Sequence, residues 1–377
     1  MDVYINAVEK FLPGDPVDND EMEFYLGKIN GVNSKARPIV LRNNGIKTRH
    51  YAIDKNQKST YSNTELTAKA IHKLENKNFS ANDIELLACG TTSPDQLLPS
   101  HASMVHGELK TGKTEYSSFG GSCNAGMLAM KYAWLSVKSG NTKNAVCTGS
   151  EKLSTWLTAN RYRNEAEKLT ELEKNPMLAF SKEFLRWMLS DGAAAALLTN
   201  KPNKNGISLK IDRIEITSFA GELETCMYAG AEKTRDGNLT PWKDFDNEYI
   251  TENSLMVLQQ DTRLLGSNIV KKGAEFLKEL LEKYDININD FSWFLPHLSS
   301  MYFKNKIYEE MKANGIFIPE EKWFLNLPHV GNVGSASAYL MLEELFNSGK
   351  LKKGEKILVM VPESARFSYT YMFLTVV

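Results

Sequence analysis

The amino-acid sequence predicts an α/β protein made of two similar halves. Short apolar runs of strand length alternate with longer helical patterns, which is typical of α/β architecture. In the first half a run of small residues, Phe119–Gly126, leads into the apolar helix Met127–Val137, and in the second half Val330–Ser337 leads into Ala338–Phe346. Because both helices are apolar around most of their circumference, we expect them to be buried. Two buried helices with similar entrances predict a duplicated fold whose helices lie between two sheets.

The first half, residues 1–200, contains a helical stretch and three core strands besides its buried helix. The polar stretch Asn63–Asn76 predicts a helix, and the apolar run Asp83–Cys89 that follows predicts a buried strand. Further strands are predicted at Asn144–Thr148 and Ala193–Leu198, whose small residues favour close packing.

The second half, residues 201–377, begins at a turn-forming stretch, Lys201–Gly206, where we place the boundary between two domains. A long strand is predicted directly after this turn, and the later apolar runs predict four more strands. These five strands are expected at Ile207–Thr217, Phe291–Leu295, Trp323–Leu327, Lys356–Val361 and Phe367–Val377.

Residues 152–190 interrupt this alternation of strands and helices. The segment is first charged and helical in character (RYRNEAEKLTELEKN) and then aromatic (FSKEFLRWML). We interpret it as a helical insertion in the first domain that lies over the surface or over the entrance of the active site. A pair of solvated helices and a cover for a substrate tunnel are both open interpretations.

The composition argues against several classes of function. Of the 377 residues 42% are hydrophobic and 24% charged, and the net charge of −1 gives no overall field that would attract nucleic acid or an anionic membrane. No segment reaches the roughly 20 apolar residues that a membrane span requires. The four cysteines show no CxxC pairing and no nearby histidine, so we expect neither a metal site nor a disulfide framework. With no signal-peptide pattern at the N-terminus, a cytoplasmic protein with reduced thiols is expected.

Cys123 is the candidate nucleophile. It lies at the entrance to the first buried helix, and its small neighbours let a substrate carbonyl approach the sulfur and the adjacent backbone N–H. The partial positive charge of a helix N-terminus favours the thiolate, and a thiolate attacks a thioester to form an acyl-enzyme. A cysteine that only fills space is the alternative, and this is our interpretation of Cys89 and Cys147, which lie within predicted strands.

Two polar residues of the second half would complete a site with Cys123. His297 closes a predicted strand, and Asn332 lies in the turn before the second buried helix. Such positions are where α/β proteins gather their sites. A neutral histidine and an asparagine both donate hydrogen bonds, so together they can stabilise the oxyanion of a thioester enolate. His297 can also be a core histidine satisfied by backbone, and we interpret His329 as a supporting residue.

The order of these motifs resembles the β-ketoacyl-acyl-carrier-protein synthase III family of the thiolase superfamily. The resemblance implies the thiolase fold, in which duplicated βαβαβαββ halves form five layers in the order αβαβα. It also implies a homodimer and a catalytic triad of Cys123, His297 and Asn332. The similar stretches run from about residue 45 to 370 and are Gly45-Ile46 with Arg49, Thr91–Asp95, Pro99-Ser100, Ser122–Gly126, Asp191–Ala194, Pro296-His297 and Gly331–Ser337.

Three departures from the family pattern narrow the resemblance. Ser299-Ser300 follows the histidine where the family usually has Ala-Asn, and Val361–Tyr369 replaces the usual Gly-rich C-terminal loop. The insertion at 152–190 is foreign to the compact initiators of fatty-acid synthesis. Together these departures indicate a relative from secondary metabolism, which looks most like the ketosynthase/cyclases that make dialkylresorcinol or stilbene precursors.

The resemblance implies a condensing enzyme without a tightly bound cofactor. An acyl thioester on coenzyme A or on the phosphopantetheine of acyl carrier protein would load Cys123. A carbon–carbon bond with a malonyl or β-ketoacyl thioester would follow, and in the ketosynthase/cyclase version a ring would then close. Glu151 is the candidate base for ring closure, or else a structural carboxylate. Arg49 is the candidate contact for the phosphopantetheine or nucleotide end of the donor, or else part of a surface ion pair. Lys271-Lys272 and Lys304 with Lys306 are candidate docking residues for an acidic carrier.

Other functions of the same fold remain open. An acyltransferase that moves an acyl group to an alcohol or amine would need Cys123 and His297, whereas only condensation would depend strongly on Asn332. A non-catalytic partner subunit would typically lose the nucleophile, which this sequence retains. An unrelated Cys–His hydrolase would need a residue that orients the histidine, and no signature for one is present. The sequence does not specify either acyl substrate.

Overall fold

The computed structural model describes residues 1–34, 36–162 and 184–377. Its large elements fall into two series of the same order, except that the second has no counterpart of β5, and shorter elements fill the connections. The first series is β1 (Tyr4–Phe11), α3 (Asn63–His72), β4 (Leu86–Thr91), α4 (His101–Leu109), β5 (Glu115–Phe119), α5 (Ala125–Ser139), β6 (Asn144–Glu151) and β7 (Gly192–Thr199). The second is β8 (Leu209–Ser218), α11 (Thr262–Lys283), β13 (Phe291–Pro296), α12 (Tyr302–Ala313), α14 (Ser337–Asn347), β14 (Lys356–Glu363) and β15 (Ser368–Val376). The shorter elements are β2 (Val17–Asp18), α1 (Met22–Leu26), α2 (Arg37–Asn44), β3 (Thr48–Arg49), α6 (Ser154–Leu157), β9 (Met227–Tyr228), β10 (Ala231–Lys233), β11 (Leu239–Pro241), α10 (Asn247–Glu252), β12 (Gln259–Gln260) and α13 (Leu327–Val330).

The long strands are hydrogen-bonded in the order β13-β14-β15-β8-β1-β7-β6-β4-β5. The strands of each series form one half of this arrangement, and the halves are joined where Tyr4 and Ile5 of β1 pair with Lys210 and Leu209 of β8. Within the halves β4 runs parallel to β5 and β6, and β13 runs parallel to β14. The predicted boundary at residues 201–206 falls in the connection between β7 and β8, and the division into two domains stays a prediction.

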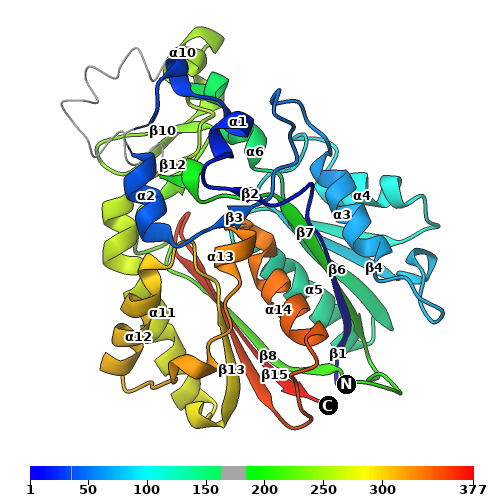
Figure 1. The fold of residues 1–377 in the computed structure, drawn as a ribbon. Helices are drawn as coiled ribbons and strands as arrows, with labels where there is room; N and C mark the ends of the chain where they lie inside the picture. The colour runs from blue at the N-terminus through cyan, green and yellow to red at the C-terminus, as the bar shows by residue number, and fades with distance from the viewer. Residues whose placement is uncertain (35, 163–183) are drawn as a thin grey trace.

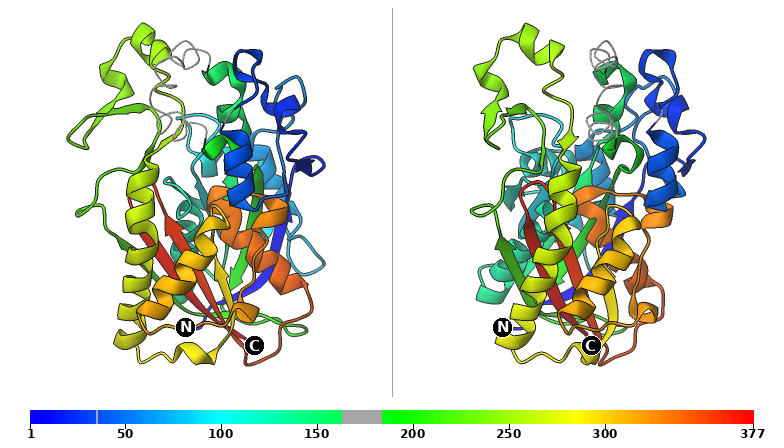
Figure 2. Two further views of the ribbon diagram at one scale, coloured as in Figure 1. Left: turned by 60° about the vertical axis from the view of Figure 1, so that its left-hand side comes forward. Right: turned by 90° about the vertical axis from the view of Figure 1, so that its left-hand side faces the viewer.

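Helices separate and cover the two half-sheets (Figures 1 and 2). Helices α5 and α14 lie between the half-sheets, where α5 packs on β4, β5 and β6 and α14 packs on β1, β7, β13 and β14. Helices α3 and α4 cover the outer face of the first half-sheet, and α11 and α12 cover that of the second. The resulting layers are helix, sheet, helix, sheet, helix, so the predicted five-layer thiolase fold is confirmed.

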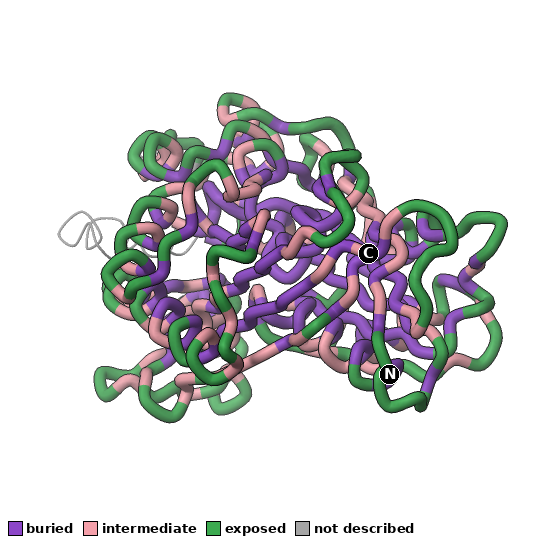
Figure 3. The backbone as a smooth tube through the Cα atoms, turned by 90° about the horizontal axis from the view of Figure 1, so that it is seen from below, coloured by how far each residue is buried: buried purple, intermediate pink, exposed green. Residues whose placement is uncertain are grey.

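The apolar core is divided in the same way as the layers. One cluster fills the space around the two central helices and includes Met127, Met130 and Leu340. The other two clusters lie under the outer helices, with Leu66 on α3 in one and Phe276 on α11 in the other. Burial therefore concentrates in the sheets and central helices, and exposed backbone lies at the periphery (Figure 3). This placement explains why α5 and α14 are apolar on nearly every side.

The predicted strands are confirmed with small shifts, except one. The strand expected from Asp83 begins at Leu86, because Asp83 accepts a hydrogen bond from the Ser80 backbone N–H and closes a short 3-10 helix. The strand expected at Trp323–Leu327 is wrong. Only a single parallel bridge joins Trp323 to Phe294, and Leu327 already begins α13. The run is apolar because its aromatic rings pack edge-on against Phe294 and its neighbour on β13.

The insertion predicted at 152–190 is described at its two ends. Tyr162 and Trp187 are fully buried, and Leu157 of α6 and Leu185 join the same apolar cluster as Met22. These ends are therefore part of the core and not solvated helices. Most of the charged stretch falls within residues 163–183, which lie outside the described residues. Among the helices of the described part, none is long and apolar enough to cross a membrane.

Candidate active site

Cys123 lies in the turn that opens α5. The turn contains Gly121 at φ +141°, a backbone conformation that favours glycine, and the Ser122 hydroxyl donates to the Cys123 sulfur over 3.7 Å. Asn124 is the N-cap residue of α5. Its side chain is held by β15 of the second half, since its Nδ2 donates to Ser368 Oγ over 2.9 Å and its Oδ1 accepts from Thr370 Oγ1 over 2.6 Å. The nucleophile predicted from the first half is thus fixed by the second.

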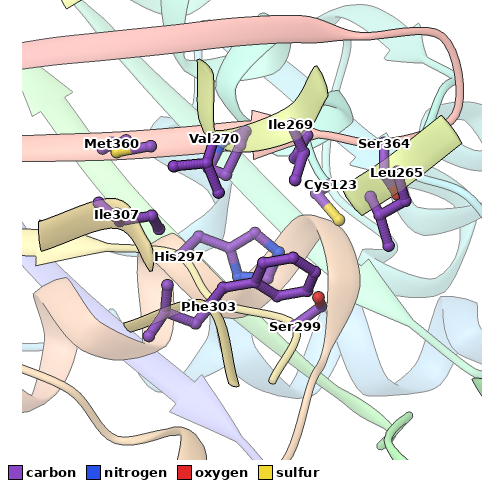
Figure 4. A pocket seen from close by; sticks show the side chains of 12 residues that line it. Cys123, Leu265, Ile269, Val270, His297, Ser299, Phe303, Ile307, Met360 and Ser364 are labelled. Carbon is purple, nitrogen blue, oxygen red and sulfur yellow. The ribbon is translucent and has the colours of Figure 1, made fainter. Parts of the chain in front are cut away.

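Cys123 opens onto an apolar pocket that it shares with His297 (Figure 4). The pocket has an empty volume of about 410 Å³, part of which is open to solvent. Most of its wall comes from two outer helices and the end of β14. The other lining residues are Leu265, Ile269 and Val270 of α11, Leu298 and Ser299 after β13, Phe303 and Ile307 of α12, and Met360, Pro362 and Ser364. Such an apolar wall suits contact with hydrocarbon groups and limits the access of water to the sulfur.

The electrostatic setting of Cys123 keeps the resting sulfur protonated. The pKa of the thiol is raised to about 12, chiefly by burial and also by the Glu363 and Glu151 carboxylates, while the Ser122 hydroxyl acts in the opposite direction. The positive end of α5 also favours the thiolate, but such an effect is worth only about 0.3 to 2 kcal/mol. The sequence-based expectation of a thiolate in the resting site therefore does not follow from the structure, and a proton must leave the sulfur when a thioester is attacked.

His297 follows β13 directly and is held by the strand beside it. Its backbone N–H donates to the Met360 carbonyl over 2.8 Å. Figure 4 shows its imidazole in the same pocket as the Cys123 thiol, with the Phe303 ring alongside. Burial lowers the pKa of His297 to about 4, so the ring is neutral at physiological pH. A neutral imidazole has one donor and one acceptor nitrogen, which suits both proton transfer and stabilisation of an oxyanion.

Asn332 lies on the tight turn between α13 and α14. Gly331 adopts φ +73°, and a Cβ there would lie 2.8 Å from the Ser190 Cβ, so the position requires glycine. The Asn332 backbone bonds to Met188 and Ser190, and its side-chain Oδ1 accepts from the Gly334 N–H over 3.0 Å. This bond fixes the amide so that Nδ2 is its remaining donor. Asn332 is buried, but it is not among the residues that line the pocket of Cys123 and His297.

Glu151 ends β6 and is fully buried. Its carboxylate accepts from the Thr92 N–H and hydroxyl, from the Ser93 hydroxyl over 2.6 Å and from the Ser335 N–H over 3.1 Å. Burial raises its pKa, and these donors act against that rise. Ser335 belongs to the turn that carries Asn332, so Glu151 ties that turn to the ends of two strands of the first half. It does not line the pocket.

Arg49 of β3 is fully buried beneath the turn of Asn332, where a Cβ on Gly331 would lie 3.0 Å from its own Cβ. Within the described residues, none of its three guanidinium nitrogens has a hydrogen-bond partner. The alternative of a surface ion pair is therefore wrong. Burial also lowers the pKa of this guanidinium. His329, in contrast, is exposed in α13; its carbonyl accepts from the Thr48 hydroxyl, and its backbone N–H donates to the Asn326 carbonyl.

Two sets of residues at the site were not found from the sequence. The first is the apolar wall from α11 and α12, whose only signal was the amphipathic pattern of the helices themselves. The second is Glu363 at the end of β14, a carboxylate only 6% exposed that influences the Cys123 thiol. An acidic residue two positions after the apolar run KILVMV was a usable signal for it.

Comparisons with known proteins agree with this geometry. Residues 281–363 match the family model described as 3-oxoacyl-[acyl-carrier-protein] synthase III C terminal. The chain is 25% identical to β-ketoacyl-[acyl-carrier-protein] synthase III of Clostridium perfringens over 93% of its length and 92% of the relative's. It is 26% identical to the protein of the same name from Aquifex aeolicus over 84% of the chain and 83% of the relative.

Solved structures share the whole fold. The tetronic acid condensing enzyme AbyA1 superposes with a TM-score of 0.74 at 18% identity, covering 99% of each chain. A variant of Xanthomonas campestris OleA with bound lauric acid and lauroyl-CoA superposes with a TM-score of 0.73 at 19% identity, covering 100% of this chain and 99% of that one. Over nearly its whole length the chain is therefore similar to β-ketoacyl-acyl-carrier-protein synthase III proteins, and it shares the fold of the condensing enzymes among the solved structures.

Proposed function

We propose that the protein is a condensing enzyme that joins an acyl group on Cys123 to a second thioester through a carbon–carbon bond. The observation that carries the proposal is the pocket that Cys123 and a neutral His297 share, walled by aliphatic side chains. A nucleophile beside an apolar wall can hold an acyl chain, and a neutral imidazole beside it can move a proton or donate to an oxyanion.

In the first step the Cys123 sulfur attacks the carbonyl carbon of an acyl thioester. The backbone N–H of Cys123 at the entrance of α5 is the proposed donor to the tetrahedral oxyanion. Because the resting thiol is protonated, His297 is the proposed carrier of its proton to the departing thiolate. The carbonyl–sulfur bond of the substrate breaks, a new one to Cys123 forms, and the free thiol leaves.

In the second step an enolate of the incoming thioester attacks the acyl group on Cys123. His297 and Asn332 are the proposed donors to the enolate oxygen, with the Asn332 amide oriented for donation by the Gly334 N–H. A malonyl thioester would form the enolate by losing carbon dioxide, whereas a β-ketoacyl thioester would give up its acidic α-proton to a modest base. The Cys123 sulfur then leaves as the new carbon–carbon bond forms.

The pocket favours acyl groups with a hydrocarbon tail. Its aliphatic wall gains roughly 0.8 kcal/mol for each methylene removed from water, so chain length affects binding strongly. Coenzyme A and acyl carrier protein are both proposed carriers of the thioester. Arg49 is still the proposed contact for the donor arm, and because its guanidinium is fully buried, the arm must enter the protein to reach it.

Ring closure to a dialkylresorcinol-type precursor is the finer proposal, with Glu151 as the base. The donors around the Glu151 carboxylate favour instead a role in holding the turn of Asn332. The Glu151→Gln variant separates these roles. A base for ring closure predicts normal acylation of Cys123 with an uncyclised product, whereas a supporting role predicts a slower reaction with the same product profile.

The alternative function is acyl transfer to an alcohol or amine. The Asn332→Ala variant distinguishes it, because condensation needs an enolate donor and simple acyl transfer does not. If the protein condenses two thioesters, this variant should still acylate Cys123 but lose carbon–carbon bond formation by about 100-fold or more. Retention of full product formation by Asn332→Ala would favour the acyltransferase.

A homodimer and a carrier protein are the proposed partners. β5 is the outermost strand of its half-sheet, and Glu115 and Tyr116 on it are exposed, so a second copy has an unpaired edge to meet. The proposed docking lysines gain less support, since Lys271 and Lys272 pair with Glu275. Light scattering of the purified protein tests the dimer.

A further inference from the structure

The end of β14 carries a buried carboxylate that the proposed reaction does not use. Glu363 Oε1 accepts from the Ala365 N–H, and its Oε2 accepts from the Ser368 N–H over 3.2 Å and from the Ser368 hydroxyl over 3.0 Å. The residues on either side of it, Pro362 and Ser364, line the pocket. The carboxylate therefore lies directly behind the wall that faces Cys123.

A chain of hydrogen bonds leads from this carboxylate to the entrance of α5. The Ser368 hydroxyl donates its proton to Glu363 and accepts from Asn124 Nδ2 over 2.9 Å. Thr370 donates to the Asn124 Oδ1 over 2.6 Å, so both ends of the Asn124 amide are fixed. Asn124 follows Cys123 directly and caps the helix whose N-terminus faces the sulfur. A movement of Ser368 would therefore displace the Asn124 side chain and, through it, the adjacent backbone of Cys123.

The first half of the fold contains a counterpart of Glu363 and its hydrogen bonds. β6 and β14 are equivalent strands of the two series, and each ends in a buried glutamate. Glu151 of the first half bonds to Ser335, in the turn that opens α14 of the second half. Glu363 of the second half reaches, through Ser368, the turn that opens α5 of the first. Each carboxylate thus holds the helix entrance of the opposite half, which makes Glu151 a matched control for Glu363.

We propose that Glu363 is a positioning residue of this site. Through Ser368 it fixes the Asn124 amide, and with it the N–H and thiol of Cys123, while its negative charge disfavours the Cys123 thiolate. Glu363 acts through Cys123 and not by contact with a substrate. Its effect on turnover rests on the proposed function, whereas its effect on the reactivity of the Cys123 thiol does not. Its electrostatic effect agrees with this geometry, since Glu363 raises the pKa of Cys123 more than Glu151 does.

Other titratable groups surround this network and define what must be controlled. Cys123 is influenced by Glu151 of β6 and shares its pocket with His297 after β13. On its other side Glu363 is coupled to Cys226 and to Tyr369 of β15. Burial raises the pKa of both of these groups, so both stay neutral up to about pH 9 and cannot imitate a change in the charge of Glu363.

The test is the rate at which iodoacetamide alkylates Cys123 as a function of pH, followed by mass spectrometry of the Cys123 peptide. Glu363→Gln keeps the shape of the side chain and removes its charge, so alkylation at pH 8 should be at least about threefold faster than in the wild type. Glu151→Gln should change this rate less. A Glu363→Gln rate that matches the wild type at every pH would overturn the electrostatic part of the proposal.

The positioning part is tested by Ser368→Ala, which cuts the hydrogen-bond chain and leaves the charge of Glu363 in place. Turnover should fall about tenfold with KM nearly unchanged, while the alkylation rate keeps the pH dependence of the wild type. Unchanged turnover in Ser368→Ala would contradict the positioning role. Circular dichroism and thermal unfolding verify that both variants are folded. Because alkylation needs no thioester, its outcome does not depend on whether the protein condenses or only transfers acyl groups.

Discussion

The resting state of Cys123 can be tested through the pH dependence of its chemistry. In the structure burial raises the pKa of the thiol from an ordinary 9.0 to about 12, which corresponds to about 4 kcal/mol against the thiolate. The N-terminus of α5 opposes this by at most about 2 kcal/mol. Burial is the larger effect, so the thiol should be almost entirely protonated at pH 8, with roughly one molecule in 10⁴ ionised.

Alkylation by iodoacetamide reports the thiolate directly. Between pH 6 and 10 the rate at Cys123 should rise about tenfold for each pH unit without a plateau. Because His297 has a pKa of about 4, it stays neutral across this range and adds no inflection. At pH 8 the rate should be about 1,000-fold below that of a cysteine in an unfolded peptide measured alongside. A plateau near pH 7 to 8 would refute the reasoning, because it would show that the field of α5 outweighs burial.

Three further predictions concern stability. Burial lowers the pKa of His101 and of His297 to about 4, whereas in the unfolded chain each takes up a proton near pH 6.5. The free energy of unfolding should therefore fall by about 3 kcal/mol per histidine as the pH drops from 6.5 to 4. A urea midpoint that does not change with pH would contradict this. Arg49→Met removes a buried cation without a hydrogen-bond partner among the described residues and should leave the urea midpoint unchanged or higher. Arg186→Met leaves three backbone carbonyls without their hydrogen-bond donor and should cost about 3 kcal/mol or more of the free energy of unfolding. Equal losses of stability in the two variants would count against this. Gly149→Ala would place a Cβ on β6 only 2.3 Å from the Ser335 carbonyl oxygen and should cost about 3 kcal/mol in thermal unfolding. A stable variant would show that β6 and the turn before α14 are not in tight contact.

Local patterns were sufficient to predict the central layer of the fold. The runs before α5 and α14 are rich in small residues that allow tight turns and close approach, and the helices that follow are apolar around most of their circumference. A helix with this pattern must be buried on nearly all sides, and in an α/β protein a position between two sheets provides such burial. Cys123 and His297 were predicted for the same reason, since helix entrances and strand ends are fixed by the chain locally. Their meeting in one site was an expectation from the family resemblance, and the structure places Cys123 and His297 in one pocket.

Features that depend on distant pairing were not predicted. The strand predicted at Trp323–Leu327 is wrong because the run is apolar through packing of its aromatic rings and not through a continuous ladder of strand hydrogen bonds. The sequence does not distinguish an apolar run of this kind from a buried strand. Glu363 and Asn124 are more than 200 positions apart and are connected only because the start of β15 lies against the N-terminus of α5. Arg49 was expected to contact the donor arm or to form a surface ion pair, and its full burial next to Gly331, which rules out the second, is encoded by no local pattern.

The central claim is that Cys123 carries the acyl group, and trapping the acyl-enzyme tests it most directly. The purified protein is incubated with a series of saturated acyl-coenzyme A thioesters, and its intact mass is measured before and after hydroxylamine treatment. We expect a mass increase equal to one acyl group on the Cys123 peptide, its loss with hydroxylamine, and no adduct in Cys123→Ala. An adduct of the same size that persists in Cys123→Ala, or none in the wild type with any chain length, would contradict the account.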